Sequence, residues 1–558
     1  MISRKLLLIG ISALAFSAGA AHAQTSTNVS DVSQTGTDNI AEIDNATAGN
    51  RDNRSTVVQN GTRNRGTVVQ LGNINISQIQ QIGDDDLAVH TQEGDFQQAE
   101  SYQTGNNDRS AIRQRGLFNS ATVTQNGNRN VSQIAQGAEI ATADFFNATS
   151  ATTARLGDDN RATVRQIGND FTSTIRQRAS ASGVAAGGNT ANVTQRGQGN
   201  ASNILQESRG NFAEVFQFQG GTTDATRNST TITQQNSGAA NGNNPASNNR
   251  VSVAVNGFGN SSTVTQNGLN NIAEATQGLG QSNTLRISQI GSGTANRAAA
   301  AQFGNSNATT ISQNTTGSRA DVWQQPGPSS SRSGNNSADI AQGTGASGSA
   351  DSFSGSFFGN AAPVTGSATR NLVASITQGN GSGPAIWNVA QVRQDGVDLT
   401  ARVEQSGSGT AALPNIVRIA QQGGANGGNS AVAIQRAGVG PSSSSDSAPT
   451  GQSGDEFFFA GGARSAEITI LQGGSSNSAT VEQRGRGQFA RIEQGPGSGN
   501  TASILQDTSA TNATAIVRQT GSNNSYSVTQ ADANQYILVS QTGNNNTVTN
   551  VVKRGPGS

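Results

Sequence analysis

The chain lacks cysteine altogether and is poor in aromatic residues, which make up 4 % of its 558 positions. Without cysteine, neither disulfides nor thiolate metal sites can stabilise the fold. Only two histidines are present, His22 and His90. Catalytic triads and zinc sites that depend on histidine are therefore nearly excluded. The sequence predicts neither an enzyme nor a protein that holds a metal or another cofactor.

An excess of charge of one sign is also missing, since 35 basic residues balance 35 acidic ones. This balance argues against binding to nucleic acid and against electrostatic attachment to membranes. Hydrophobic residues amount to 32 %, a poor supply for one compact core, and such a composition by itself suggests disorder. A repeat would remove this difficulty, because a solenoid needs only a thin buried stripe.

The first 23 residues have the pattern of a secretory signal peptide. Arg4 and Lys5 precede a short apolar run, and Ala21-His22-Ala23 is an A-x-A cleavage site. We expect cleavage between Ala23 and Gln24. The apolar run is too short for a lasting membrane anchor, and nothing later in the sequence replaces it. The mature chain is expected to lie outside the cytoplasm.

The feature that replaces a conventional core is a glutamine that recurs every eleven residues. The unbroken run consists of Gln59, Gln70, Gln81, Gln92, Gln103, Gln114, Gln125 and Gln136. Seven of these glutamines have a glycine two residues later, at Gly61, Gly72, Gly83, Gly94, Gly105, Gly116 and Gly127. A fixed period of this kind indicates one small unit stacked on copies of itself.

The full unit reads Asn-x-Ala-x-Val/Ile-x-Gln-x-Gly, with signature residues at alternate positions, as in the strand around Ala121 and Val123. This is the periodicity of a β-strand. We expect the signature residues inside, and Thr122 and Thr124 outside. Further units contain Gln166, Gln195, Gln483, Gln519, Gln530 and Gln541. The predicted fold is an all-β, amyloid-like β-solenoid of strand-turn-strand coils, with about 11 residues per unit and about 22 per coil.

A buried glutamine without a partner loses about 1–3 kcal/mol. Stacked coils remove this loss if each glutamine amide bonds to the equivalent amide one coil away, forming a ladder as in cross-β assemblies. We predict such a ladder at all the glutamines named above. The glycines named above are expected to supply the positive φ that a tight turn demands. A location of the glutamines on an outer face is disfavoured, because alanine and valine share their parity.

Changes in the regularity of the repeat divide the chain into segments. The expected segments are a signal peptide over 1–23, an N-terminal leader over 24–48, a repeat solenoid over 49–236, an Asn/Gly-rich insert over 237–262, a repeat solenoid over 263–325, a Gly/Ser/Pro-rich insert over 326–370, degenerate repeats over 371–437, a Gly/Ser-rich insert over 438–464 and a C-terminal repeat solenoid over 465–552. The inserts are expected to be loops or flexible joints, so the solenoid is not expected to be continuous.

Two other features invite a chemical interpretation. Asp84, Asp85 and Asp86 follow Gly83, and carboxylates on a turn can hold calcium. Their spacing does not match a calcium loop and the cluster does not repeat coil by coil, so we expect solvated turn residues. His90 has the inward parity, and we expect a tolerated residue of the core or its edge.

The pattern Ser/Asn-x5-Gln-x-Gly-x-x-Asn-x-Ala-x3-Gln resembles the curlin repeat of bacterial curli subunits. It stands here as Asn53…Gln59-x-Gly61…Asn64…Gln70. The resemblance implies a secreted subunit of extracellular amyloid fibres (a fimbrium or pilus) on a Gram-negative bacterium, used for biofilm matrix and cell adhesion. It also implies export through the periplasm and a curli-type secretion pore, partner subunits that nucleate or accompany the fibre, and an export-targeting role for 24–48.

The leading functional hypothesis is a head-to-tail homopolymer. A solenoid exposes unpaired strand edges at both ends unless it is capped, and Asn546-x-Val548-x-Asn550-x-Val552 begins a further unit instead of a cap. The alternatives are a monomeric β-solenoid surface adhesin and an ice-binding rod. Ice binding is disfavoured because the outer Thr122 and Thr124 are not repeated, as Arg161-Thr163-Arg165 shows.

Overall fold

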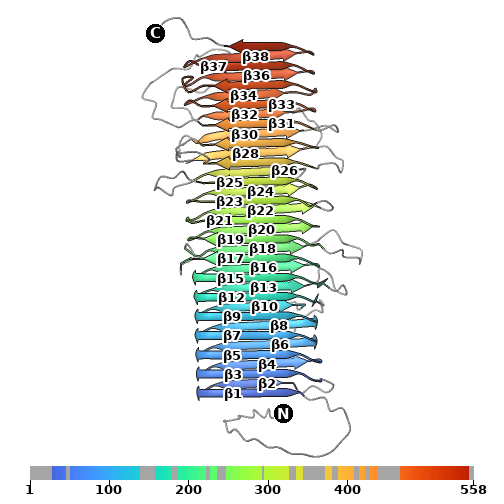
Figure 1. Cartoon of the computed structure of the whole chain (residues 1–558), viewed down its shortest axis with the longest axis vertical. Coiled ribbons are helices and arrows are strands. Elements are labelled where there is room, and N and C mark those ends of the chain that lie inside the picture. Colours follow the sequence, from blue (N-terminus) through green and yellow to red (C-terminus); the bar gives the residue numbers. More distant parts are fainter. Residues whose placement is uncertain are drawn as a thin grey trace, which may run out of the picture.

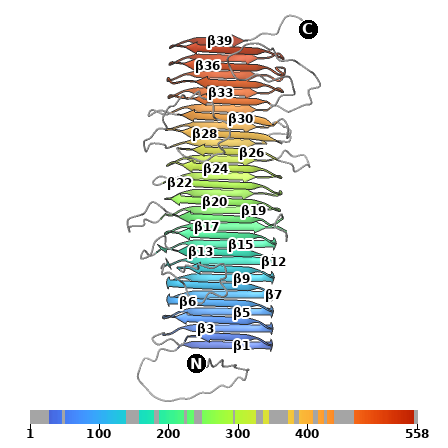
Figure 2. The same ribbon diagram turned by 180° about the vertical axis from the view of Figure 1, so that it is seen from behind.

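The computed structural model describes residues 28–45, 51–137, 157–178, 186–221, 226–235, 247–291, 295–325, 335–343, 371–379, 387–406, 414–422, 428–436 and 466–551. Within these ranges the chain forms 39 β-strands and no helix, so no helix there could cross a membrane. The strands stack into one long β-solenoid that runs from β1 at one end to β38 and β39 at the other (Figures 1 and 2). The predicted all-β solenoid is confirmed.

Two parallel sheets form the long faces of the solenoid, and the chain alternates between them. The first sheet contains 19 strands: β1 (Val29–Thr37), β3 (Arg54–Thr62), β5 (Ile76–Asp84), β7 (Gln98–Asn106), β9 (Ser120–Asn128), β12 (Arg161–Asn169), β15 (Thr190–Gln198), β17 (Phe212–Phe218), β19 (Arg250–Asn256), β21 (Ile272–Gln277), β23 (Arg297–Gln302), β25 (Arg319–Gln324), β27 (Val373–Gln378), β29 (Thr400–Gln405), β31 (Ser430–Gln435), β33 (Ser478–Gln483), β35 (Thr501–Gln506), β37 (Ser525–Gln530) and β39 (Thr547–Val551).

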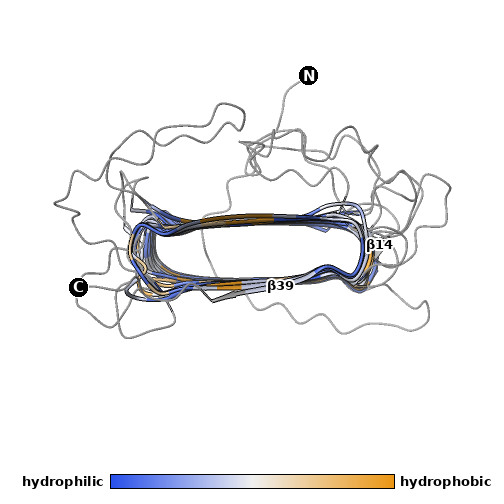
Figure 3. Ribbon diagram, turned by 90° about the horizontal axis from the view of Figure 1, so that it is seen from above, coloured by the Kyte–Doolittle hydropathy of each residue, from blue (hydrophilic) through white to orange (hydrophobic). Residues whose placement is uncertain are grey.

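The second sheet contains 18 strands in the described residues: β2 (Ile40–Asp44), β4 (Arg65–Leu71), β6 (Leu87–Asp95), β8 (Arg109–Leu117), β10 (Val131–Gln136), β13 (Thr172–Arg178), β16 (Ala201–Glu207), β18 (Ser229–Gln235), β20 (Ser261–Gly268), β22 (Thr284–Gly291), β24 (Ala308–Asn314), β26 (Ser337–Gln342), β28 (Asn388–Asp395), β30 (Asn415–Gln422), β32 (Glu467–Gln472), β34 (Phe489–Gln494), β36 (Thr514–Thr520) and β38 (Tyr536–Thr542). A small pair, β11 (Gly157–Asp158) and β14 (Ala186–Gly187), lies beside them. Viewed along the axis, the two sheets are flat layers that face each other and are joined by turns (Figure 3).

Successive coils are paired in register, with equivalent residues directly above one another. In β3 and β5, Gln59 lies opposite Gln81. The register is kept across long connections. For example, Gln421 of β30 lies opposite Gln472 of β32 although 51 residues separate them. Side chains therefore form columns that run along the solenoid axis, one column for each position in the repeat.

The interior is a thin apolar layer between the two sheets. Ala121 and Val123 of β9 are completely buried, whereas Thr122 and Thr124 lie partly exposed on the outer face. This is the orientation that the alternation predicts. A fully buried valine or isoleucine contributes about 1.5–3 kcal/mol. Since most of the described strands bury at least one, the stripe compensates for the low apolar content of the chain.

Several expected boundaries are wrong. Residues 24–48, expected to be a leader, contain β1 and β2, which pair with β3 and β4 as the first coil. The expected inserts 237–262 and 326–370 contain β19 and β26, and both strands hold regular places in their sheets.

Residues 371–437, expected to be degenerate, contribute β27 to β31, and the solenoid is continuous. The reason is that each coil needs only two short in-phase strands, so connections of any length can leave between them. The expected signal peptide 1–23 and insert 438–464 lie outside the described residues.

The turn glycines are required by backbone shape and by space. All seven predicted glycines, from Gly61 to Gly127, have positive φ, between 110° and 145°. A Cβ atom at Gly83 would lie 1.5 Å from the carbonyl oxygen of Gly105 in the next coil. In the N-terminal coils the strands extend through this glycine over nine residues, as in β3 and β5.

We expect Gly83→Ala to lower the free energy of unfolding by more than about 2 kcal/mol, because it adds backbone strain to a steric clash. Gly188→Ala is the matched control. Gly188 also has positive φ, 68°, but a Cβ there would meet no atom within 4 Å, so only backbone strain of about 1–2 kcal/mol applies. Thermal unfolding of both variants measures the difference, and equal losses would contradict the close-stacking argument.

Candidate assembly site

The predicted glutamines are buried and form two hydrogen-bonded columns, one in each sheet. In the first sheet, Gln59 Nε2 donates to Gln81 Oε1 at 2.8 Å. In the second sheet, Gln70 Nε2 donates to Gln92 Oε1, also at 2.8 Å. The structure places the expected glutamines in the first column at Gln59, Gln81, Gln103, Gln125, Gln166, Gln195, Gln483 and Gln530, and in the second at Gln70, Gln92, Gln114, Gln136, Gln519 and Gln541.

The second hydrogen of each amide ties the two sheets together. Gln92 Nε2 in β6 also donates to the carbonyl oxygen of Ile76, the first residue of β5, at 3.0 Å. Gln103 in β7 does the same with Leu87 of β6 at 3.1 Å. Because both amide hydrogens find an acceptor, the glutamine is buried without an unsatisfied donor. One side chain thus links neighbouring coils and opposite sheets.

The glutamines between Gln195 and Gln483 in the two columns were not predicted as site residues from the sequence. These are Gln217, Gln277, Gln302, Gln324, Gln378, Gln405 and Gln435 in the first sheet, and Gln206, Gln234, Gln266, Gln289, Gln313, Gln342, Gln394, Gln421 and Gln472 in the second. Insertions stretch the separation from 22 to as many as 54 residues. The alternating strand pattern around each glutamine could have identified these residues, whereas the distance in sequence between successive glutamines could not.

The first-sheet column is interrupted once, at Val255 of β19, which lies opposite Gln217. The neighbouring glutamines find other partners. Gln217 Nε2 donates to Thr230 Oγ1 at 3.0 Å, and Gln277 Oε1 accepts from Ser262 Oγ at 2.7 Å. Hydroxyls from the facing sheet thus replace the missing amide, which shows that satisfied hydrogen bonding, more than glutamine itself, is the constraint.

A second polar column lies at the turns and is built from asparagine. Asn53 Oδ1 accepts the backbone N–H of Asn75 at 2.9 Å, while Asn53 Nδ2 donates to the carbonyl oxygen of Gly72 at 2.8 Å. A matching asparagine column lies at the turns that lead into the second sheet, and Asp86 and Asp108 occupy two places in it, between Asn64 and Asn130. The expectation of a solvated turn is wrong for Asp86, which is 1 % exposed, and burial raises its pKa to about 7.

The other two aspartates of that turn are partly exposed, and Asp85 forms a two-bond ion pair with Arg63 of the preceding coil, at 2.6 and 2.5 Å. The described residues contain no group of three or more His, Asp or Glu side chains placed to hold a metal ion.

His90 lies in the core at the position that Val68 and Ile112 occupy in the adjacent coils. Its Nδ1 and Nε2 atoms are 2.8 and 2.7 Å from the hydroxyls of Ser77 and Ser101 in the facing sheet. Complete burial lowers the pKa of His90 to about 3. The imidazole is therefore a neutral packing residue with both nitrogens satisfied.

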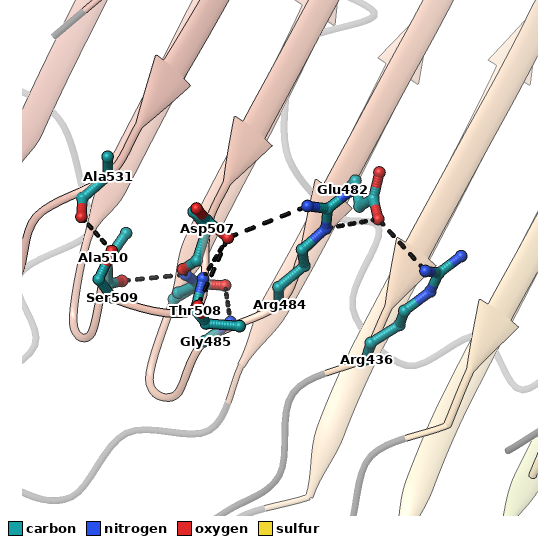
Figure 4. A network of polar contacts seen from close by, with 10 residues as sticks. Arg436, Glu482, Arg484, Gly485, Asp507, Thr508, Ser509, Ala510 and Ala531 are labelled. Carbon is teal, nitrogen blue, oxygen red and sulfur yellow. Dashed lines mark hydrogen bonds and ion pairs between the residues drawn. The ribbon is translucent and has the colours of Figure 1, made fainter. Parts of the chain in front are cut away.

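Charged side chains on the outer face pair across coils. Glu482 of β33 contacts Arg484 at 2.8 Å and Arg436, which follows β31, at 3.7 Å. Arg484 in turn approaches Asp507, which follows β35, at 3.9 Å. Figure 4 shows this chain of opposite charges across three coils. Opposite charges in neighbouring coils favour the in-register arrangement, since like charges would face each other at the inter-strand spacing.

The two ends of the solenoid differ from its middle. At the N-terminal end every residue of β1 is exposed. At the other end, Tyr536 and Leu538 of β38 are 59 % and 51 % exposed. The columns also have a direction, because each glutamine donates toward the C-terminal end. Gln34, for example, donates to Gln59 at 2.6 Å. Acceptors therefore face the N-terminal end and donors the C-terminal end.

The comparison with known families agrees with the repeat. A family model described as the curlin-associated repeat matches residues 465–495, a range that contains β32, β33 and β34. No curated protein matches the chain. The resemblance to the curlin repeat is thereby confirmed for this segment, and the repeat and the fold together fit a curli-like structural protein.

We expect Gln81→Ala to lower the free energy of unfolding by about 2–3 kcal/mol more than Gln80→Ala. Gln81 is buried in the first column, and its loss leaves Gln59 Nε2 and Gln103 Oε1 without their partners. Gln80 is the neighbouring residue on the outer face of the same strand. Denaturant unfolding measures both variants, and similar losses would show that the column contributes nothing to stability.

Replacing His90 with valine should raise stability progressively below pH 6.5. The unfolded chain protonates this histidine near pH 6.5, whereas the folded chain does so only near pH 3. Since the unfolded state binds more protons between these values, stability is lost as the pH falls, by about 1.4 kcal/mol per unit. Denaturation curves at pH 4 to 7 should show His90→Val gaining on the parent at this rate. Thr91→Val, on the outer face, should not.

Proposed function

We propose, from a chain that carries a curlin-associated repeat at residues 465–495, that this protein is a secreted structural subunit that self-assembles into curli-like amyloid fibres. The fibres would serve biofilm matrix and cell adhesion on the surface of a Gram-negative bacterium. The subunit would reach the surface through the periplasm and a curli-type secretion pore. Its partners would be further copies of itself and nucleating or accessory subunits.

The observation that carries the proposal is the in-register column. Each coil binds the next through backbone pairing, the glutamine column and the asparagine column, and none of these contacts depends on the chain being continuous. A coil from another copy could make the same contacts. The exposed strand edges of the end coils are the surfaces where this addition would occur.

The direction of the columns favours head-to-tail addition. Donors point toward the C-terminal end, where Gln530 Nε2 and Gln541 Nε2 have backbone carbonyls as partners instead of a further glutamine. The Oε1 atom of Gln34 faces the opposite end, since no glutamine of the described residues precedes it in the column. Joining a C-terminal end to an N-terminal end would keep the direction of the columns. Joining two C-terminal ends would oppose donors to donors, and joining two N-terminal ends would oppose acceptors to acceptors.

Charge also favours unlike ends. Residues 28–45 contain four acidic residues and no lysine or arginine, namely Asp31, Asp38, Glu42 and Asp44. Two such acidic ends repel each other, so charge disfavours joining two N-terminal ends. A heterologous contact between unlike ends does not close on itself and so leads to an open filament.

Fibre formation by the purified mature chain tests the proposal. We expect filaments with reflections near 4.7–4.8 and ~10 Å, the spacings of strands and of stacked sheets. A chain that remains monomeric for days at high concentration would favour the alternative of a monomeric surface adhesin, for which the end coils need no partner.

The C-terminal glutamines should set the rate of growth. We expect elongation to slow when alanine replaces Gln519, Gln530 and Gln541 together. Each replacement removes a ladder hydrogen bond worth about 0.5–1.5 kcal/mol and leaves the neighbouring amide without its partner. The control replaces Ser527, Thr529 and Ser540, which lie on the outer face of β37 and β38, and should elongate normally. Unchanged kinetics in the glutamine variant would exclude this end as the growth site.

A further inference from the structure

The asparagine column at the turns that lead into the second sheet contains two carboxylates, Asp86 and Asp108. In the coil before them, Asn64 performs two tasks. Its Oδ1 accepts the backbone N–H of Asp86 at 3.0 Å, and its Nδ2 donates to the carbonyl oxygen of Gly83 at 2.7 Å. The first task needs an acceptor and the second needs a donor. An ionised aspartate can supply only the acceptor.

Asp86 and Asp108 occupy equivalent positions in consecutive coils and retain only the first task. Asp86 Oδ1 accepts the N–H of Asp108, and Asp108 Oδ1 accepts the N–H of Asn130, both at 2.9 Å. Each remaining Oδ2 atom is buried and without a hydrogen-bond partner. By the offset that Asn64 shows, these atoms take the place of donors to the carbonyl oxygens of Gly105 and Gly127.

The asparagines on either side of the two aspartates in this column, Asn64 and Asn130, donate to their glycine carbonyls at 2.7 and 2.9 Å. A neutral carboxylic acid donates across 2.7–2.8 Å in an ordinary O–H···O bond. It has the shape of the amide and restores the donor that the column lacks. An ionised carboxylate at the same place would set two acceptors against each other in a buried site.

We propose that Asp86 and Asp108 form a proton-operated latch, in which neutral carboxyl groups close the asparagine column and loss of their protons loosens the coils from β5 to β9. The occupant of the site is the proton itself. The latch lies within the coils and acts whether or not the chain forms fibres.

The electrostatic surroundings agree with this assignment. Burial raises the pKa of both Asp86 and Asp108 to about 7, and the charge of Asp86 raises the pKa of Asp108 further. Asp84 and Asp85 on the same turn add to the effect on Asp86.

The cations nearby do not offset this rise. Arg63 is engaged by Asp85, and the side chain of Arg65, which begins β4, approaches Glu42 at 3.6 Å. Arg109 and Arg129 adjoin Asp108 and Asn130 in sequence, and Arg129 is paired with Asp170.

The direction of the pH dependence follows from proton counting. The unfolded chain ionises these aspartates near pH 3.8, whereas the folded chain keeps them protonated up to about pH 7. Their contribution to stability is therefore complete below pH 3.8 and is lost as the pH rises through 7. His90, in the same coils, acts in the opposite sense below pH 6.5. Between pH 5 and 6.5, opening these coils releases two protons from the aspartates and takes up one at His90.

Hydrogen exchange of the full chain, followed by mass spectrometry over β5 to β8 between pH 5 and 6.5, tests the latch. After correction for intrinsic exchange, one net proton released changes the opening constant by about tenfold per pH unit. The parent should open about tenfold more readily with each unit of rising pH. Asp86→Asn should abolish this dependence, and Asp86→Asn with Asp108→Asn should reverse it, because only His90 then remains.

Asp38→Asn is the matched control, since Asp38 is an exposed turn residue, and it should keep the parental dependence. An unchanged pH dependence in the double variant would overturn the proposal. A second arm adds calcium chloride at pH 7.5. Slower exchange with calcium in the parent but not in the double variant would show that a cation fills the column, and would overturn the proton latch as well. No effect of calcium on either chain would support it.

Discussion

Everything in this molecule depends on stacking each residue directly on its equivalent in the next coil. In-register parallel pairing places equivalent side chains of successive coils about 4.8 Å apart, the inter-strand distance. Each position must therefore hold a residue that can stack on a similar residue. Apolar residues meet this condition by packing, as Val57 does on Ile79. An amide meets it because it carries a donor and an acceptor. Glycine meets it where the backbone itself comes closest, as at Gly83.

The same condition explains which charges are tolerated. Like charges stack only on the exposed face, as Arg297 does on Arg319, apart from the aspartates discussed below. On the turns Arg63 is followed one coil later by Asp85, and Arg129 by Asp170. Each ion pair is exposed and adds little stability, but two like charges at these places would repel each other. Asp86 above Asp108 breaks the rule in a buried site. A proton is the simplest way to make such a pair acceptable, which is why that place in the column responds to pH.

The fold could be predicted from the sequence because alternation and period are local signals, and the outward Thr122 and inward Val123 follow from parity alone. The glutamine and glycine positions near the N-terminus followed from spacing. The continuity of the solenoid could not be predicted in this way, because long connections interrupt the eleven-residue spacing. Gln421 and Gln472 stack although 51 residues separate them. Two further features could not be predicted from the sequence, because both depend on contacts between coils. One is the burial of Asp86, and the other is the use of Thr230 and Ser262 as hydrogen-bond partners where Val255 replaces a glutamine.

A structure in which every coil is held by its neighbours has no natural end. The interior coils are satisfied on both sides, whereas β1 and β38 are satisfied on one side only, and covalent continuity is the only difference between a contact within the chain and a contact with another chain. The hydrogen-bonded columns give these two ends opposite character, acceptors at Gln34 and donors at Gln541. In the assembly proposed above, the interaction that stabilises the fold would therefore also set the direction in which further copies are added.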